Sequence, residues 1–265
     1  MACFMPMVLG MWFLAGALSL VIGVTLGLLG GGGSILTLPM LVYVMSVDAK
    51  PAIASSLFVV GVTSFVGTLG HARAGRVKWH VGGLFGVSGM AGAFAGGKVA
   101  AFVPGTLLLL GFGAMMLLTS FAMIRGRREG ADDGGRPVSV VKALALGASV
   151  GFVAGMVGAG GGFLVVPSLV LIGGLAMKEA VATSLLVITM QSVAGFAGHV
   201  THVSLDWTLL AVVTGAAVVG SLFGARLTKR FAPATLRKAF GWLVLAMGLF
   251  LLIKNLPFTR SIGPS

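Results

Sequence analysis

Two glycine clusters, each inside an apolar run and followed by a proline, constrain the fold of this chain more than any other feature. Residues 27–42 read GLLGGGGSILTLPMLV and residues 155–170 read GMVGAGGGFLVVPSLV. Glycine lets the backbone turn or approach a neighbour closely. An unpaired backbone amide costs several kcal/mol in hydrocarbon, so such backbone survives only where protein or water covers it. We interpret both stretches as broken helices that meet near the middle of a membrane, around a binding site.

The composition is that of a membrane protein. Of the 265 residues, 57% are hydrophobic and only 9% are charged, whereas soluble domains carry about 25% charged residues. We expect one transmembrane domain over residues 1–265, embedded in the lipid bilayer. The net charge of +12 does not indicate nucleic-acid binding, because the basic residues lie in short loops between apolar segments. The single cysteine, Cys3, excludes an intramolecular disulfide and a cysteine metal cluster.

The second half of the chain repeats the first. An offset of 128 aligns residues 27–79 with residues 155–207 without a gap and gives 19 identities in 53 positions. The identities include proline, lysine, histidine and tryptophan: Pro39/Pro167, Lys50/Lys178, His71/His199 and Trp79/Trp207. Matches of such residues at one offset indicate a duplication. We expect repeat one over residues 7–124, a cytoplasmic linker over 125–138 and repeat two over 139–254.

Loop charges predict that the two repeats are inverted. Lysine and arginine gather in the loops 71–80, 125–142 and 225–238, which the positive-inside rule places in the cytoplasm. Loops 97–105 and 199–206 are poor in both and are expected on the other side. Equivalent loops therefore lie on opposite sides. Both termini are expected to be periplasmic, in a bacterial inner membrane.

Apolar runs predict five helical segments in each repeat. They are expected at residues 7–28, 34–46, 52–70, 80–97 and 105–124, then at 139–157, 162–176, 179–198, 207–225 and 235–254. The second segment of each repeat is too short to span as a regular helix. The predicted fold class is an all-α polytopic membrane protein with two inverted-topology repeats and a short-helix hairpin in each. Whether these hairpins span or re-enter stays open.

No pattern of catalytic residues accompanies this fold. All six carboxylates fall in loops or at the ends of predicted spans: Asp48, Glu129, Asp132, Asp133, Glu179 and Asp206. Intramembrane hydrolysis needs paired carboxylates, a metal-binding helix or a nucleophile with its base, and a site for a metal cation needs buried carboxylates. We therefore expect neither an enzyme, nor a metal site, nor a cofactor.

The glycine clusters offer backbone amides in place of charged side chains. A helix that begins near Ser34 or Gly162 points its unpaired N–H groups and positive end at the preceding turn. Two such ends facing each other would hold one small anion. For a single cluster, close packing is the simpler interpretation; the duplication with a matched proline favours a site.

Polar side chains follow on the next segment of each repeat. The stretch Ala54-Ser55-Ser56-Leu57 matches Ala182-Thr183-Ser184-Leu185, and its hydroxyls either cap the helix or face the anion. Gln191 is the amide side chain well inside a span, which fits either a contact between helices or a substrate contact. His71 and His199 end matching spans, where a capping role competes with proton gating.

The paired GxxGxGG…P motifs, with the A-[ST]-S-L stretches after them, resemble the sulfite exporter TauE/SafE family of membrane permeases. The resemblance covers residues 10–254 and implies transport of sulfite or an organosulfonate. Carried over position by position, it implies these candidate substrate-binding residues: Gly30, Gly32, Gly33, Ser34, Pro39, Ser55, Ser56, Gly158, Gly160, Gly161, Gly162, Pro167, Thr183 and Ser184. We add Gln191 on its chemistry, and His71 and His199 as gating candidates.

The function expected from the sequence is therefore secondary transport, in the export direction, of a small sulfur-containing anion across the inner membrane. A passive anion channel and a permease for another small organic anion stay as alternatives. Coupling to H⁺ is compatible with the two histidines, and coupling to Na⁺ is compatible with the backbone carbonyls of the broken helices. No nucleic-acid partner is expected.

Overall fold

A computed structural model describes residues 5–29, 34–125, 140–158, 161–171, 174–227 and 233–255 of the chain. Every regular element within these ranges is a helix, in agreement with the predicted all-α class. The helices of the first half are α1 (Met5–Leu29), α2 (Ser34–Pro39), the π-helical turn η2 (Met40–Val44), α3 (Ala49–Arg73), α4 (Trp79–Ala100) and α5 (Gly105–Arg125). Those of the second half are α6 (Val140–Val157), α7 (Gly162–Leu171), α8 (Met177–His199), the 3₁₀ turn η3 (Val200–His202), α9 (Trp207–Leu227) and α10 (Pro233–Asn255).

The short second segment of the first half is not a uniform α-helix. It is α-helical up to Pro39 and then widens into η2. Proline lacks an N–H group, and its ring crowds the carbonyl four residues earlier; a π-helical turn is one way for the backbone to accommodate such a break. The matched segment, α7, contains Pro167 and stays α-helical to Leu171.

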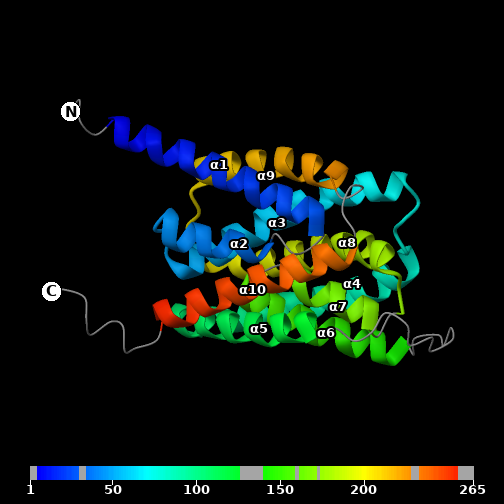
Figure 1. The fold of residues 1–265 in the computed structure, drawn as a ribbon. Helices are drawn as coiled ribbons and strands as arrows, with labels where there is room; N and C mark the ends of the chain where they lie inside the picture. Colours follow the sequence, from blue (N-terminus) through cyan, green and yellow to red (C-terminus); the bar gives the residue numbers. More distant parts are fainter. Residues whose placement is uncertain are drawn as a thin grey trace.

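The helices run roughly along one axis and form an elongated bundle (Figure 1). Helices α1 and α9 pack together along one side, and α4 packs on both α6 and α8. Helices α5 and α10 form another pair, and α3 crosses α8 in the interior. In Figure 1, α1 begins and α10 ends at the same, left-hand end, which we name the terminal end.

Glycine gives the tightest helix contacts, and these contacts join the two halves of the chain. A Cβ built on Gly23 of α1 would lie 2.0 Å from the carbonyl oxygen of Ala217 in α9. A Cβ built on Gly151 of α6 would lie 2.1 Å from that of Gly89 in α4. Adding 128 to Gly23 gives Gly151, and subtracting 128 from Ala217 gives Gly89. The second contact is therefore the equivalent of the first, with the two halves of the chain exchanged. Only glycine allows such backbone approach.

Three further contacts along these helices repeat by the same rule. Gly27–Ser221 matches Gly155–Ala93, Gly220–Leu20 matches Gly92–Ala148, and Gly224–Val24 matches Gly96–Phe152. In α4, the residues Gly82, Gly86, Gly92 and Gly96 all lie so close to a neighbouring helix that a Cβ would meet it within 3.0 Å.

The crossing of α3 and α8 lies at the centre and shows the same reciprocity. A Cβ on Gly67 would lie 3.2 Å from Leu185 Cδ1, and one on Gly195 would lie 3.3 Å from Leu57 Cδ1. Leu57 and Leu185 are each 1% exposed. The two buried helices thus interlock, with a leucine of each filling the space over a glycine of the other.

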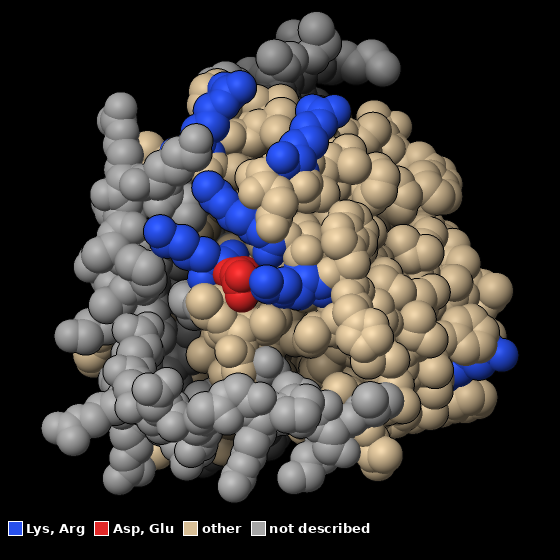
Figure 2. All heavy atoms as spheres, turned by 90° about the vertical axis from the view of Figure 1, so that its right-hand side faces the viewer, with Lys and Arg blue, Asp and Glu red and all other residues tan. Residues whose placement is uncertain are grey.

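The end of the bundle opposite the terminal end is basic. Figure 2 shows lysine and arginine side chains gathered there. On this face, which we name the basic end, the described basic residues are Arg73, Arg76, Lys78, Lys178 and Arg226. Within the described residues, three helical segments are long and apolar enough to cross a membrane: Ala49–Arg73, Lys178–His202 and Trp207–Leu227.

Candidate functional site

The glycine clusters are described in part. Gly30, Gly32, Gly33 and Gly160 lie outside the described residues. Ser34 begins α2 and Gly162 begins α7, as the sequence predicts, but the Ser34 side chain lies outside the described part. The site geometry is therefore defined by the second cluster and by the residues packed against it.

The turn between α6 and α7, which we name the second hairpin, depends on two glycines with positive φ. Gly158 has φ +78° and Gly161 has φ +68°, a region that side chains other than glycine rarely adopt. A Cβ on Gly158 would also lie 2.6 Å from Ile53 Cγ2 of α3. The Gly161 carbonyl accepts hydrogen bonds from the Leu164 and Val165 amides, both 2.9 Å long, and so starts α7.

Ser56 of the first half binds this second hairpin. Its hydroxyl donates to the Gly158 carbonyl and also lies 2.8 Å from the Ile53 carbonyl. The side chain is fully buried. One predicted site residue thus caps the carbonyl of another, across a separation of 102 positions in the chain.

Gln191 of α8 is the most informative residue of the site. Its side chain is fully buried, and neither its amide oxygen nor its amide nitrogen has a hydrogen-bond partner. A Cβ on Gly161 would lie 2.8 Å from its Oε1, and one on Gly89 of α4 would lie 2.1 Å from its Nε2. The amide therefore sits between the second hairpin and α4. Leaving a buried polar group unsatisfied costs about 1–3 kcal/mol, so this amide is poised for a polar ligand or water.

Other buried hydroxyls lack partners in the same part of the bundle. Ser64 of α3 and Ser192 of α8 occupy matched positions, and the hydroxyls of both are unpaired. A Cβ on Gly61 of α3 would lie 3.2 Å from Ser192 Cβ, which places Ser192 at the crossing of α3 and α8. Thr37 of α2 is also fully buried with an unpaired hydroxyl. Because buried polar groups are almost always paired in proteins, these atoms mark a polar interior around the hairpins.

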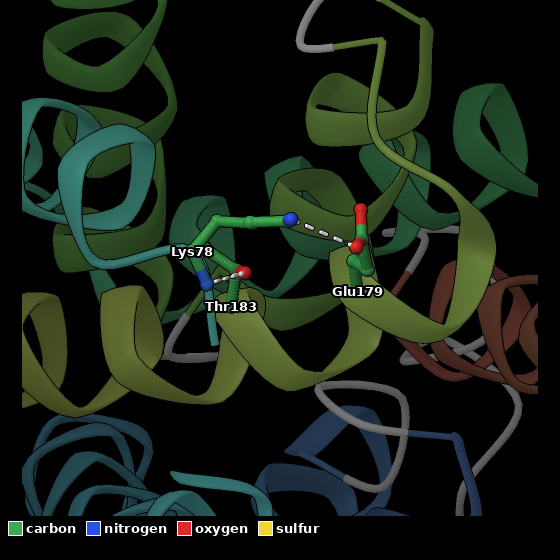
Figure 3. Close-up of polar contacts among 3 residues, drawn as sticks. All are labelled: Lys78, Glu179 and Thr183. Atoms are coloured by element: carbon green, nitrogen blue, oxygen red, sulfur yellow. Dashed lines mark hydrogen bonds and ion pairs between the residues drawn. The ribbon is translucent and has the colours of Figure 1, made fainter. Parts of the chain in front are cut away.

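Two predicted hydroxyls have structural partners instead. Thr183 accepts a hydrogen bond of 3.0 Å from the Lys78 backbone amide, at the basic end (Figure 3). Lys78 also reaches Glu179 through its ammonium group, with an N–O distance of 3.0 Å. Ser184 donates to the Val181 carbonyl of its own helix, and Ser55 is 8% exposed. Among the described residues, Ser184 and the matched Ser56 both donate to the carbonyl three residues earlier, whereas Thr183 differs from the matched Ser55 in its contact with Lys78.

The gating candidates and the prolines are also in the interior. His199 is 3% exposed, with Nε2 2.8 Å from the Gly155 carbonyl, while His71 is 7% exposed and its Nε2 has no partner. Pro39 is buried and Pro167 is half-buried. The helices that carry these prolines, α2 and α7, contact each other.

The sequence did not single out Gly89 or Thr37. Gly89 is one glycine among many in α4, and nothing in the chain around it indicates that it faces Gln191. Thr37 is a lone hydroxyl in an apolar run, which is more often satisfied by its own helix. Among the described residues, no group of histidine, cysteine and carboxylate side chains could hold a metal ion.

An apolar helical bundle, broken helices and buried polar groups around their breaks are typical of a membrane transporter. The comparison with known families agrees, since the profile described as "Sulfite exporter TauE/SafE" matches residues 15–251. The chain belongs to the sulfite exporter TauE/SafE family.

Similar proteins occur in bacteria and archaea. A probable membrane transporter protein of Xylella fastidiosa (strain 9a5c) is 32% identical over 241 residues, covering 88% of this chain and 92% of that protein. The probable membrane transporter protein YdhB of Bacillus subtilis (strain 168) is 28% identical, covering 87% and 96%. A probable membrane transporter protein of Methanocaldococcus jannaschii is 25% identical, covering 89% and 95%. No solved structure matches the chain.

Proposed function

We propose that this protein is a secondary transporter that exports a small sulfur-containing anion, such as sulfite or an organosulfonate, across the bacterial inner membrane. The observation that carries the proposal is the unpaired amide of Gln191 beside Gly161 at the second hairpin. The family is named for sulfite export, which supports the choice of a sulfur oxyanion.

The site suits an anion because its donors are amides and hydroxyls. The α7 helix begins at Gly162, so its first N–H groups and its positive end point toward the hairpin turn. Gln191 places its amide oxygen beside Gly161 and its nitrogen beside Gly89, so a half-turn of this unpaired amide would bring its N–H groups to the hairpin. Ser192, next to it in α8, has an unpaired hydroxyl. Donors of this kind bind an anion without the desolvation cost of a buried lysine, which is several kcal/mol.

We further propose that the two halves are inverted repeats and that the anion crosses by alternating access between them. The glycine contacts that recur at the offset of 128 support a two-fold relation between the halves. The direction of the hairpins supports inversion, because α2 lies toward the terminal end and α7 toward the basic end (Figure 1).

The distribution of charge supports one orientation in the membrane. Lysine and arginine gather at the basic end, which would face the cytoplasm by the positive-inside rule. The terminal end would then face the periplasm. A membrane potential that is negative inside favours anion exit by about 2.3 kcal/mol per charge per 100 mV, so export needs no coupling ion.

The experiment is transport by the purified protein in liposomes. Vesicles loaded with sulfite, sulfate, methanesulfonate or acetate are diluted into anion-free buffer, and anion release is followed with and without an imposed potential. We expect release of sulfite or methanesulfonate above that from protein-free vesicles, accelerated by a potential that drives anions out. No flux of any sulfur anion would contradict the proposal.

The same vesicles separate a transporter from a channel and from other coupling modes. Accumulation of the anion above its electrochemical equilibrium, driven by a proton or sodium gradient, identifies coupled transport. Acetate flux without sulfur-anion flux would identify a permease for another small organic anion. Flux that follows the potential and never saturates with concentration would identify a passive channel.

A further inference from the structure

A second polar site lies away from the hairpins, at the terminal end. The structure has an open cavity there of about 920 Å³, within the size range of small-molecule sites. Its wall combines η2, the residues that join η2 to α3, the first turns of α3 and α5, the end of η3 with the residues after it, and the end of α10. Asn255 and Tyr43 both line the cavity, and the Asn255 Nδ2 donates to the Tyr43 hydroxyl. We name this cavity the terminal vestibule.

The vestibule gathers positive charge at an end of the bundle that has little. The described lysines at this end are Lys50, Lys98 and Lys254, and two of the three line the cavity. Among the described lining residues, Asp48 is the one with a carboxylate. Lys50 donates one hydrogen bond of 2.8 Å to the Ala101 carbonyl, and an ammonium group has three donors, so two remain for a ligand.

Backbone donors add to this charge. Ala49 and Lys50 begin α3, Gly105 and Thr106 begin α5, and all four line the vestibule. The first amides of a helix have no partner within it, and each helix brings its positive end. Two long helices and two lysines thus direct donors into one open space, while the hydroxyls of Ser204 and Thr106 supply further polar contacts.

At the basic end, the lysine that matches Lys50 has different neighbours. Lys178 corresponds to Lys50, but Glu179 follows it where the first half has Pro51. Glu179 pairs with Lys78, and the Lys78 amide is bound to Thr183, so this end is tied together (Figure 3). The surroundings of Lys50 in the vestibule are therefore not repeated around Lys178 at the basic end.

We propose that the terminal vestibule is a second anion-binding site, selective for a small sulfonate or sulfur oxyanion over cations, which the anion occupies as it enters or leaves the transporter. The identity of the anion rests on the proposed function. The site itself rests on the cavity, its lysines and its amides.

The test measures the charge preference of the vestibule without requiring transport. In the full-length protein with Cys3→Ser, in nanodiscs, Ser204→Cys places a thiol on the vestibule wall, and Phe102→Cys places one on an 87% exposed position of the same end, outside the lining. The probes are two methanethiosulfonate reagents, one with a sulfonate group and one with a trimethylammonium group. We expect the anionic reagent to be favoured several-fold more at position 204 than at position 102.

Charge variants give the sharper result. Added to Ser204→Cys, Lys254→Gln should lower the ratio of anionic to cationic rates about fivefold, because one charge acts on the two reagents with opposite sign. Asp48→Asn should raise it by a similar factor, and the Asp48 side chain makes no capping hydrogen bond that would be lost. Lys98→Gln is the matched control, since Lys98 lies over the Phe94 ring, outside the lining, and it should leave the ratio unchanged.

Occupancy of the vestibule by an anion is measured as protection of the thiol from modification. Chloride is replaced by methanesulfonate at constant ionic strength. We expect methanesulfonate to slow modification at position 204 and not at position 102, and the slowing to vanish with Lys254→Gln. Equal ratios of anionic to cationic modification rates at positions 204 and 102 would overturn the proposed anion site in the vestibule, and so would the absence of protection. Either result would do so whether or not liposomes transport sulfite. A positive result in a protein that moves no sulfur anion would uphold this anion site and refute only the proposed function.

Discussion

At the scale of single residues, Gln191 tests whether the buried polar atoms serve a ligand. We expect Gln191→Leu to lower sulfite transport roughly tenfold or more, because a hydrogen bond to a charged group contributes about 1.5–3 kcal/mol. Thermal stability of the same variant should stay equal or rise, since an unpaired buried amide is replaced by an apolar side chain of similar size. The measurements are liposome flux and a thermal unfolding curve.

Thr63→Val supplies the control for that variant. Thr63 occupies the matched position in the other repeat, is fully buried, and donates to the Val59 carbonyl at 2.6 Å. Its hydroxyl is therefore satisfied within its own helix, and its loss should cost little transport. If Gln191→Leu unfolds the protein instead, or if it transports like the unmodified chain, the amide is a packing group.

Gly89 provides an independent approach to the same side chain. Its Cβ would lie 2.1 Å from Gln191 Nε2, so Gly89→Ala should displace the amide and lower transport without changing any polar group. Gly83→Ala, on the same helix, is the control, because a Cβ there meets nothing within 4 Å. Equal flux in the two variants would show that the position of Gln191 does not matter to transport.

The residues that the sequence identified and missed differ in a physical way. Gln191 stands out because an amide inside a span is costly, and the turn glycines stand out because they are duplicated. Gly89 and Thr37 become informative only once their neighbours are known. The hydroxyls of Ser55 and Thr183 occupy matched positions in the sequence, yet in the described contacts it is Thr183 that binds the Lys78 amide.

At the scale of elements, the lengths of the apolar runs predicted where the helices lie but not which helices pack together. The predicted segment 207–225 is Trp207–Leu227, and 105–124 is Gly105–Arg125. Of the segment expected at 162–176, Gly162–Leu171 is a helix and residues 174–176 are not, and the π-helical turn after Pro39 was not predicted. The pairing of α1 with α9 and of α6 with α4 was also missed, because glycine spacing marks a face for close packing without naming the helix that packs there.

The matched glycine contacts predict matched energetic effects. Gly23→Ala and Gly151→Ala should each destabilise the bundle by about 1–3 kcal/mol, because each added Cβ would overlap a backbone carbonyl and force two helices apart. The added Cβ would lie 2.0 Å from the Ala217 carbonyl oxygen in the first variant and 2.1 Å from the Gly89 carbonyl oxygen in the second. Denaturation in mixed micelles measures the loss. Gly16→Ala in α1 and Gly215→Ala in α9 meet nothing within 4 Å and should be neutral or slightly stabilising.

Effects of clearly different size at the two matched positions would count against a two-fold relation between the halves. Equal losses, together with neutral controls, would show that both repeats use the same interface at the same strength. The measured quantity is stability and not transport, because Gly151 packs on Gly89, which in turn contacts Gln191.

At the scale of the whole molecule, orientation decides what the charge distribution can do. We expect an impermeant maleimide added outside intact cells to label Ser204→Cys in a Cys3→Ser background, and to label Ala74→Cys only after the membrane is opened. Both positions are exposed, and Ala74 lies between Arg73 and Arg76 at the basic end, which the positive-inside rule holds in the cytoplasm. Labelling is read by gel shift, with Cys3→Ser alone as the blank.

This orientation links the two proposed anion sites to the direction of transport. With the terminal vestibule in the periplasm, an anion leaving the Gln191 site moves down the membrane potential toward lysines that attract it, so export is favoured electrically. If position 74 were labelled from outside and position 204 were not, the vestibule would face the cytoplasm and would instead collect the anion before export. Labelling of both positions from outside would contradict a single orientation and, with it, the assignment of the basic end to the cytoplasm.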